Sequence, residues 1–323
     1  MVSDIVGMRD FVDGHFFHFN AGEVARTARS LNTFLDNGGK IFLTLAGAMS
    51  TARIGKILAP MIRRGHIAAI SCTGANLEED LFYLMAKHEY NSIPSYNDLT
   101  PEDEEELLAK GYNRVTDVCI PEEAAIRKLE HHMLEQWISA SEKGDSKLPH
   151  QYFYVILKSK ILHDTFEGDS EESWLFAAAE CNLPLFVPGW EDSTMGNIFA
   201  ARCFEKTILT SCMKSGIDYM NELIDFYQRE AGKLGFFQAG GGIAGDFPIC
   251  VVPLLNQDLQ VKVPLWSWFA QITDATASYG GYSGAPPNEK ITWGKLAVNT
   301  PTFSIQSDAT IVLPMIFAYI LDE

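Results

Sequence analysis

A lysine near the end of the chain is the residue best suited to covalent chemistry. Lys295 stands in PNEKITWGKLAV, directly after Trp293 and Gly294, between a loop rich in glycine and proline and an extended apolar segment. Such surroundings can keep an amine partly dry, and burial lowers the pKa of an amine and makes it a nucleophile able to form imines. The alternative is a solvated surface lysine, which is the commoner situation for this residue type.

Three consecutive glycines, Gly240–Gly242, follow an apolar run and form a second candidate site. Glycine lets the backbone approach a phosphate closely, and the amides that follow can hold it. The pattern by itself is weak, because neither GxGxxG nor GxxxxGK[ST] occurs, and a tight turn leaving a sheet explains the glycines equally well.

An acidic pair, Glu78 and Glu79, follows a turn at Cys72–Gly74 and is the third candidate. These carboxylates could bind a cationic substrate and a ribose. They could instead be first-turn acids that complement the dipole of a helix. No metal site is expected, since the eight histidines include no HExxH and the cysteines no CxxC. No nucleophile elbow for a Ser-His-Asp triad is recognisable.

The elements around these residues repeat one plan, an apolar strand, a turn of small or polar residues, and a helix. The expected strands are KIFLTL, HIAAISC, LPLFV, LGFFQA, WSWFAQIT and PTFSIQ, and Asp308 is expected to cap a terminal helix. This alternation of strands and helices predicts an α/β fold with a largely parallel sheet that helices cover on both faces. It also predicts that ligands bind at the carboxyl ends of the strands. We expect one domain over 1–323, with a helical excursion near 94–147.

Composition narrows the classes of function. Of 323 residues, 25 are Lys or Arg and 42 are Asp or Glu, which gives a net charge of −17 and disfavours nucleic acid as a partner. The charge permits a cationic substrate without identifying one. No apolar run is long enough to cross a bilayer, and the opening residues lack the layout of an export signal. Six scattered cysteines suit reduced thiols, so we expect a cytoplasmic protein.

The motifs in their order resemble those of the deoxyhypusine synthase family. SYGGYSGAPPNEKITWGKLAV is similar to that family's SGA-x-P-x-E segment leading into SWGK, whose lysine forms the imine. CTGANLEEDL resembles TAGG-x-EEDL, AGGG its second glycine turn, PGWEDSTMG its P-x-x-TDGSLG, and SDATIVLP its ADASLVFP. The matches run from about Lys40 to Leu321. Several ordered motifs are more specific than any one alone.

The resemblance implies a Rossmann-like, sirtuin-like fold and a homotetramer with active sites at a dimer interface. It implies that NAD takes hydride from an amine-bearing carbon, that Lys295 captures the resulting butyl imine, and that an acceptor amine then displaces the lysine. The carboxylate of Glu289 would bind the substrate ammonium, and the ring of Trp293 would contact a cation. The implied NAD contacts are Gly47, Ala48, Met49, Ser50, Thr51, Cys72, Thr73, Gly74, Glu79, Asp192, Gly241, Asp274, Ala275, Asp308 and Ala309.

Three positions depart from the pattern of spermidine-using relatives. The family carries Asp where this chain has Asn197, His where it has Asp246, and Asp where it has Tyr282. The leading hypothesis is therefore transfer to a small diamine such as putrescine, giving a homospermidine-type product, with spermidine or agmatine as donor. The guanidinium of agmatine would suit Asp246 and stacking on Tyr282. The alternatives are a deoxyhypusine synthase that modifies a translation-factor lysine, and a catalytically silent NAD-binding or scaffold protein.

Overall fold

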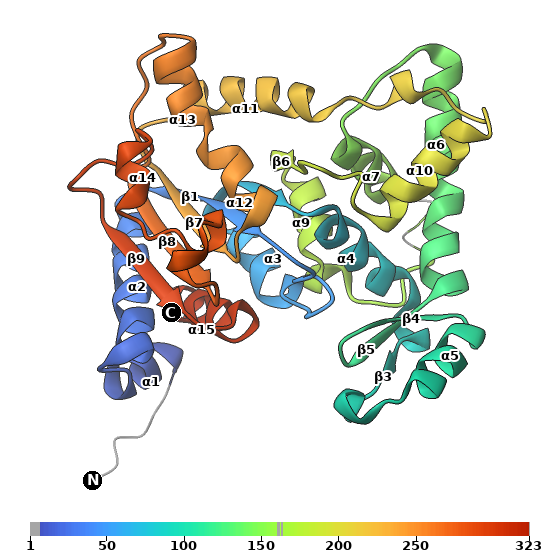
Figure 1. The fold of residues 1–323 in the computed structure, drawn as a ribbon, viewed down its shortest axis with the longest axis horizontal. Coiled ribbons are helices and arrows are strands. Elements are labelled where there is room, and N and C mark those ends of the chain that lie inside the picture. Colours follow the sequence, from blue (N-terminus) through green and yellow to red (C-terminus); the bar gives the residue numbers. More distant parts are fainter. Residues whose placement is uncertain (1–6, 160–161, 163, 323) are drawn as a thin grey trace.

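The computed structural model describes residues 7–159, 162 and 164–322, and a single large parallel sheet forms its centre (Figure 1). The strands are β1 (Lys40–Leu45), β2 (Ile67–Cys72), β6 (Leu185–Phe186), β7 (Leu234–Ala239), β8 (Trp268–Thr273) and β9 (Thr302–Gln306). They lie in the order β6-β2-β1-β7-β8-β9, and every neighbouring pair is parallel. Each strand coincides with a predicted apolar run, so the predicted α/β class is confirmed.

The order of the strands reverses between β1 and β7. From β1 the chain proceeds outward to β2 and β6, and it then returns to the other side of β1 as β7. Leu45 is aligned with Cys72 on one side and with Ala239 on the other, so the three strands end level. The turns after β1, β2 and β7 therefore open at one edge of the sheet, where α/β proteins bind their ligands.

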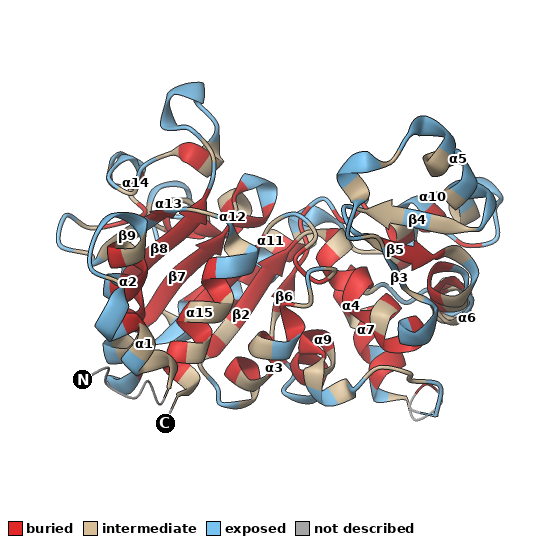
Figure 2. Ribbon diagram, turned by 90° about the horizontal axis from the view of Figure 1, so that it is seen from below, coloured by how far each residue is buried: buried red, intermediate tan, exposed pale blue. Residues whose placement is uncertain are grey.

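Helices cover both faces of the sheet (Figure 2). In that view α2 (Phe19–Asp36), α3 (Gly55–Arg63) and α15 (Ala309–Leu321) lie on one side, and α11 (Gly216–Glu230) and α13 (Val251–Pro253) lie on the other. The remaining helices are α1 (Met8–His15), α4 (Gly74–Ala86), α5 (Pro101–Ala109), α6 (Lys128–Lys143), α7 (Pro149–Lys158), α9 (Trp174–Glu180), α10 (Thr194–Phe204), α12 (Gly242–Ile249) and α14 (Glu289–Thr292).

Two adjacent aromatic residues of β7 show why both faces must be covered. Phe236 stacks on Phe42 of β1 at 5.8 Å, and Phe42 in turn lies 5.9 Å from Phe226 of α11. Phe237 lies 5.9 Å from Phe317 of α15. Because successive side chains of a strand point to opposite faces, one apolar run supplies core to two layers of helices.

The segment 94–147 is only partly the helical excursion that the sequence suggests. It contains α5 and α6, as expected, but β4 (Tyr112–Val115) and β5 (Val118–Pro121) form an antiparallel hairpin that also pairs with β3 (Asn91–Ser92). The two hairpin strands carry β-branched and aromatic residues, and a short turn with Thr116 at φ 54° joins them. These short strands were not predicted from the sequence, because the segments on either side of them have the pattern of helices.

The chain segments on either side of residues 85–166 meet at one point. The carbonyl of Leu84, near the end of α4, accepts hydrogen bonds from the backbone N–H groups of Glu167, at 2.9 Å, and Gly168, at 3.0 Å. A carboxylate oxygen of Glu167 also accepts from the N–H of His88 at 2.9 Å. The two ends of segment 85–166 are therefore fastened together.

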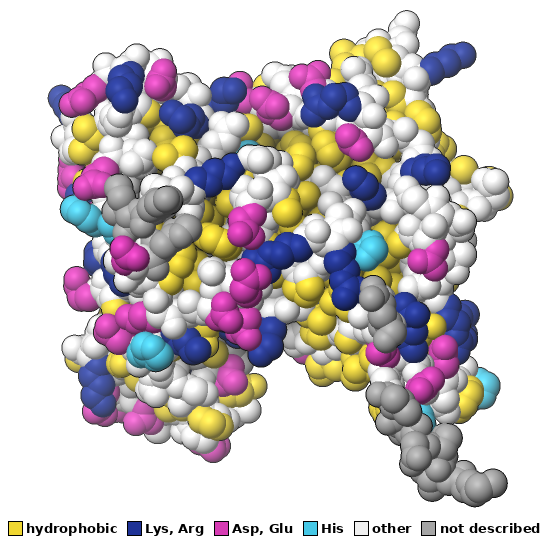
Figure 3. All heavy atoms as spheres, turned by 180° about the vertical axis from the view of Figure 1, so that it is seen from behind, with side chains coloured by type: hydrophobic (Ala, Val, Ile, Leu, Met, Phe, Trp, Pro, Cys, Tyr) yellow, Lys and Arg dark blue, Asp and Glu magenta, His cyan; other side chains and the backbone are white. Residues whose placement is uncertain are grey.

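The surface carries charged side chains of both signs. On the face opposite to that of Figure 1, apolar side chains reach the surface among them (Figure 3). Within the described part of the chain, no helix has both the length and the apolar character needed to cross a membrane. No group of three or more His, Cys, Asp and Glu side chains that could hold a metal ion occurs in residues 7–159, 162 and 164–322.

Candidate active site

A cavity of about 300 Å³ lies beyond the carboxyl ends of β7 and β8. Its walls come from α12, which follows β7, and from the long segment that follows β8. Five residues predicted from the sequence to act on the substrate line it, namely Asp246, Tyr282, Glu289, Trp293 and Lys295. The structure therefore brings the candidate nucleophile together with most of the candidate substrate residues.

Lys295 is buried at this cavity, with 5% of its surface exposed. Its N–H donates to the carbonyl of Lys290 at 3.0 Å, and its carbonyl accepts from the N–H of Trp266 at 3.3 Å, so the backbone is held on both sides. Gly294 precedes it at φ 66°, a left-handed conformation that favours glycine. The Nζ of Lys295 lies 3.4 Å from Oδ1 of Asp246, so the two side chains form an ion pair.

Tyr282 provides an aromatic wall beside the lysine. The Nζ of Lys295 lies 5.6 Å from the centre of the Tyr282 ring, within the range of cation–π attraction. The Tyr282 hydroxyl donates to Oε1 of Gln238 at 2.7 Å, and burial raises the pKa of Tyr282 well above its ordinary value. A Cβ on Gly245 would lie 2.9 Å from this ring, so the glycine makes room for it.

Trp293 and Glu289 stand on the outer side of the cavity. Trp293 is 62% exposed, and its ring lies 5.7 Å from the Nζ of Lys295. Glu289 is exposed at the start of α14. An amine entering the cavity would therefore meet an aromatic ring and a carboxylate before it reaches Lys295.

The sequence interpretation missed several residues of this site. Lys290 and Cys250 also line the cavity, and two glutamines, Gln238 and Gln271, lie fully buried behind it on neighbouring strands. The two glutamines are aligned in the pairing of β7 with β8. A polar residue inside an otherwise apolar strand was the available signal, since buried amides need partners.

All predicted cofactor residues outside α4 follow the ends of strands at the same edge of the sheet. Gly47–Thr51 comes after β1, Cys72–Gly74 spans the end of β2, Gly241 follows β7, Asp274–Ala275 follows β8, and Asp308–Ala309 follows β9. Asp192 lies between β6 and α10. Asp192, Asp274 and Asp308 are exposed, although Asp308 also caps α15, as predicted, by accepting from the N–H of Thr310 at 2.7 Å.

The turns after β1 and β2 are tied together by Asn76, which the sequence interpretation did not single out. Its Nδ2 donates to the Gly47 carbonyl at 2.8 Å, and its Oδ1 accepts from the N–H of Ser50 at 2.9 Å. Thr73 Oγ1 also donates to the Gly47 carbonyl, and Thr51 Oγ1 donates to Oε2 of Glu79 at 2.5 Å. These bonds fix the backbone of both turns.

The turns at the reversal point fit a nucleotide. A Cβ added at Gly47 or at Gly242 would meet no atom within 4 Å, so the backbone at both turns faces open space. Gly241 instead packs against Ser283, and the N–H of Gly242 donates to Ser283 Oγ at 3.0 Å. Two open glycine turns after neighbouring parallel strands are suited to the phosphates of a dinucleotide.

The three acids of the Glu78–Asp80 run have different partners, and the first-turn explanation for them is wrong. Helix α4 begins at Gly74, which places the acids in its second turn. Glu78 accepts from the N–H groups of Thr194 at 2.8 Å and Met195 at 2.7 Å, at the beginning of α10. Glu78 thus binds the beginning of α10, and burial raises its pKa to about 7.

Three predicted substrate residues do not line the cavity around Lys295. Glu78 is committed to α10, and Glu79 is bonded to Thr51. Asn197 is exposed on α10, where its Nδ2 donates to the carbonyls of Ser193 at 2.7 Å and Glu191 at 3.2 Å. Within one chain, these three side chains therefore form a group apart from the lysine.

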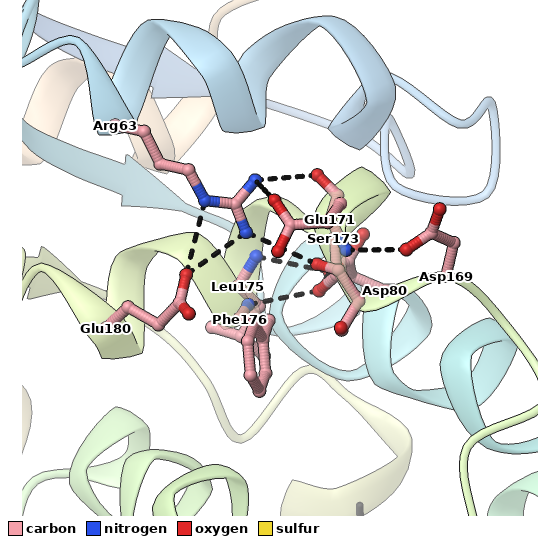
Figure 4. Close-up of polar contacts among 9 residues, drawn as sticks. Arg63, Asp80, Asp169, Glu171, Ser173, Leu175, Phe176 and Glu180 are labelled. Atoms are coloured by element: carbon pink, nitrogen blue, oxygen red, sulfur yellow. Dashed lines mark hydrogen bonds and ion pairs between the residues drawn. The ribbon is translucent and has the colours of Figure 1, made fainter.

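Asp80 joins α4 to the beginning of α9 (Figure 4). Its Oδ2 accepts from Ser173 Oγ at 2.5 Å and from the N–H of Leu175 at 3.1 Å. Burial raises the pKa of Asp80 from 3.8 to about 6. The unfolded chain therefore releases this proton at lower pH than the folded chain, so stability from this group is full below pH 3.8 and is lost as the pH rises through 6.

In Asp80→Asn the amide oxygen can accept the hydrogen bonds from Ser173 and Leu175, but the amide does not titrate. We expect the variant to gain stability over wild type between pH 4 and 6, by on the order of 1 kcal/mol per pH unit. Urea unfolding across this pH range measures the difference. Glu171→Gln, at an exposed acid in the same region, is the control and should follow wild type. If the free energy of unfolding changed with pH in the same way in wild type and Asp80→Asn, the raised pKa of Asp80 would be contradicted.

Comparison with known proteins agrees with the motifs. Residues 14–320 match the family model for deoxyhypusine synthase. A "Deoxyhypusine synthase-like protein" of Cyanothece sp. is 29% identical over 335 aligned positions, covering all of this chain and 81% of the relative. A "Probable deoxyhypusine synthase 1" of Archaeoglobus fulgidus is 31% identical, covering 94% of this chain and 90% of the relative.

The fold agrees as well. The crystal structure of a protein from Entamoeba histolytica, provisionally named a deoxyhypusine synthase, superposes with a TM-score of 0.59. The alignment covers 98% of this chain and 93% of that one at 14% sequence identity, so it bears on the fold alone. With a family model matched over nearly the whole length and a relative above 30% identity, this chain belongs to the deoxyhypusine synthase family, a family of transferase enzymes.

Proposed function

We propose that this protein is an NAD-dependent transferase that moves an aminobutyl or guanidinobutyl group between amines through an imine on Lys295. The donor is a polyamine such as spermidine, or agmatine. The acceptor is a small diamine such as putrescine, and the product is of the homospermidine type. The proposal rests first on family membership, which gives the reaction class.

The observation that carries the proposal is the position of Lys295. Its amine is buried, faces a cavity of about 300 Å³, and lies beside one carboxylate and two aromatic rings. A buried amine with restricted solvent access is suited to imine formation, because water that would hydrolyse the imine is largely kept out. The cavity is large enough for a four-carbon amine chain.

NAD would be held at the adjoining edge of the sheet by the turns that fit a nucleotide. The residues that would hold it are Gly47–Thr51, Cys72–Gly74, Glu79, Asp192, Gly241, Asp274–Ala275 and Asp308–Ala309. When bound there, NAD supplies a hydride acceptor for the amine-bearing carbon and later a hydride donor. The chain's own residues then bind the amine, exclude water and hold the covalent intermediate on Lys295.

The choice of donor depends on a nearly balanced set of charges. Two acids, Asp246 and Glu289, and two lysines, Lys290 and Lys295, line the cavity. The positive end of the donor is expected to lie toward Glu289 and the face of Trp293. The Tyr282 ring is already faced by the amines of both lysines, so a guanidinium stacked on it would have to displace one of them.

We further propose that the protein is a homotetramer whose active sites lie at a dimer interface. Large apolar side chains are exposed near the cavity, including Tyr279, Trp293 and Val298. A second copy covering them would bury apolar surface and could bring the exposed Asn197 of another subunit toward Lys295. Such an arrangement would add one predicted substrate residue to the site.

Borohydride trapping tests the function. The full chain is incubated with NAD and either spermidine or agmatine, reduced with borohydride, and analysed by intact mass, with Lys295→Ala beside each sample. We expect a stable adduct that depends on NAD and on one donor and that is absent from Lys295→Ala. The mass of the adduct distinguishes an aminobutyl from a guanidinobutyl group.

Other outcomes separate the alternatives. Modification of a translation-factor lysine, with no turnover of free diamine, would favour a deoxyhypusine synthase in the strict sense. The absence of an adduct with either donor would favour a silent NAD-binding or scaffold protein, or a different donor.

A further inference from the structure

A second buried amine lines the same cavity as Lys295. Lys290, on α14, is only 2% exposed, and it lies five residues before the candidate nucleophile. Its Nζ lies 5.2 Å from the centre of the Tyr282 ring, the same ring that the Nζ of Lys295 faces at 5.6 Å. The two amines therefore share one wall of the cavity.

The partners of Lys290 are neutral. Its Nζ donates to the carbonyl of Ala285 at 3.0 Å and to Oε1 of Gln271 at 3.3 Å, and it lies 4.9 Å from the Phe269 ring. Across the described residues, no acid forms an ion pair with Lys290, whereas Lys295 is paired with Asp246. A buried ammonium without a counter-charge is costly, so burial shifts the protonation equilibrium of Lys290 toward its neutral form.

The charges around Lys290 support the same conclusion. Burial and then the positive charge of Lys295 lower the pKa of Lys290 to about 8, against the opposing effects of Glu289 and Asp246. Burial raises the pKa of Cys250 and of Tyr282, the other titratable groups of this wall, so neither is a ready proton acceptor near neutral pH. With a pKa of about 8, Lys290 can both give up and take back a proton near neutral pH.

We propose that Lys290 is the acid–base partner of Lys295, taking the proton that Lys295 must lose before it becomes a nucleophile. The inference rests on the proposed function, in which Lys295 attacks an imine carbon. The Asp246 carboxylate holds Lys295 in place at 3.4 Å, and Lys290 is a second amine on the lining of the same cavity.

The proton balance is closed within the site. Lys295 transfers one proton to Lys290, and the freed lone pair of Lys295 Nζ forms a C–N bond to the iminium carbon of the oxidised donor. The Lys295 nitrogen then passes a second proton to the donor's own nitrogen as the bond from the carbon to that nitrogen breaks. The departing amine also takes the proton from Lys290 and leaves as an ammonium. Lys290 is neutral again, the positive charge of the iminium now resides on the Lys295 imine, and no oxidant or reductant is consumed.

Labelling with an aldehyde tests this step separately from donor oxidation. The full chain with NAD is treated with butanal and cyanoborohydride from pH 6.5 to 9.5, and alkylation of Lys295 is followed by peptide mass analysis. In wild type we expect the rate to rise with a midpoint near the pKa of Lys290, about 8.

In Lys290→Met the rate at pH 7 should fall roughly 10- to 100-fold, toward the lower range of general acid–base effects, and should approach wild type at high pH. Lys290→Arg, which keeps a charge but cannot release a proton, should behave like Lys290→Met. Lys262→Met, which removes an exposed lysine, is the control and should match wild type.

The following results would overturn the inference. The first is a wild-type rate of Lys295 alkylation that shows no midpoint near pH 8. The second is a dependence of this rate on pH that is the same in Lys290→Met as in wild type. The third is recovery of the wild-type dependence in Lys290→Arg, which would show that charge alone is needed. Alkylation of Lys290 in place of Lys295 would also overturn it. If donor and NAD give no adduct while aldehyde labelling still depends on Lys290, the proposed donors are wrong and the inference about Lys290 stands.

Discussion

Replacing Lys295 by arginine is expected to lower amine-transfer turnover by on the order of 10⁴-fold or more, as loss of a covalent nucleophile does in other enzymes. Arginine can maintain the ion pair with Asp246, but its guanidinium stays protonated and forms no imine. The fold and the affinity for NAD should therefore persist. Turnover is measured by chromatography of the product amines, and NAD affinity by calorimetry.

The comparison with NAD binding makes this prediction specific. A variant that loses both turnover and NAD affinity would indicate damage to the fold and not loss of the nucleophile. Turnover within tenfold of wild type would show that the nucleophile lies elsewhere, and Lys290 would then be the first residue to test.

Replacing Phe42 by alanine is expected to cost about 3–5 kcal/mol of stability, the range found for large aromatic residues in cores. Phe42 is fully buried at the middle of the sheet. Its ring lies 5.7 to 5.9 Å from the rings of Phe186, Phe226, Phe236 and Trp266, which come from β6, α11, β7 and the residues before β8. Its loss opens a cavity that several elements border.

Urea unfolding measures this change in the free energy of unfolding. Phe204→Ala is the matched control, because Phe204 is 89% exposed at the end of α10, and the expected change is within about 0.5 kcal/mol. A loss below 1 kcal/mol for Phe42→Ala would mean that the neighbouring rings collapse into the space.

The centre of the sheet could be predicted because the strands β1, β2, β7 and β8 are almost fully buried. A run such as KIFLTL or LGFFQA is apolar on both faces only when helices cover both sides, so each run marks a strand of a parallel sheet. The turns at the carboxyl ends follow from those strands. The hairpin formed by β4 and β5 could not be found in the same way, since its strands are short and only partly buried.

The candidate site could be predicted less completely. The importance of Lys295 came from its motif, but its pairing with Asp246 joins residues 49 positions apart and depends on how α12 packs after β7. Lys290 reads as an ordinary charged residue in a polar loop. Its burial results from contacts with Gln271, Ala285 and Phe269, which the order of residues does not reveal.

Both ends of segment 85–166 are held together at the Leu84 carbonyl, and this affects where the chain can tolerate changes in length. Because both ends of the segment meet at one hydrogen-bonded point, an insertion at an exposed turn between them leaves β2 and β6 anchored on either side. The exposed turn at Gly144 and Asp145 is thus a suitable place for inserting a foreign domain or reporter. The same insertion between β8 and Lys295 would displace the amine itself, so tolerance to changes in length is expected to differ sharply between these two parts of the molecule.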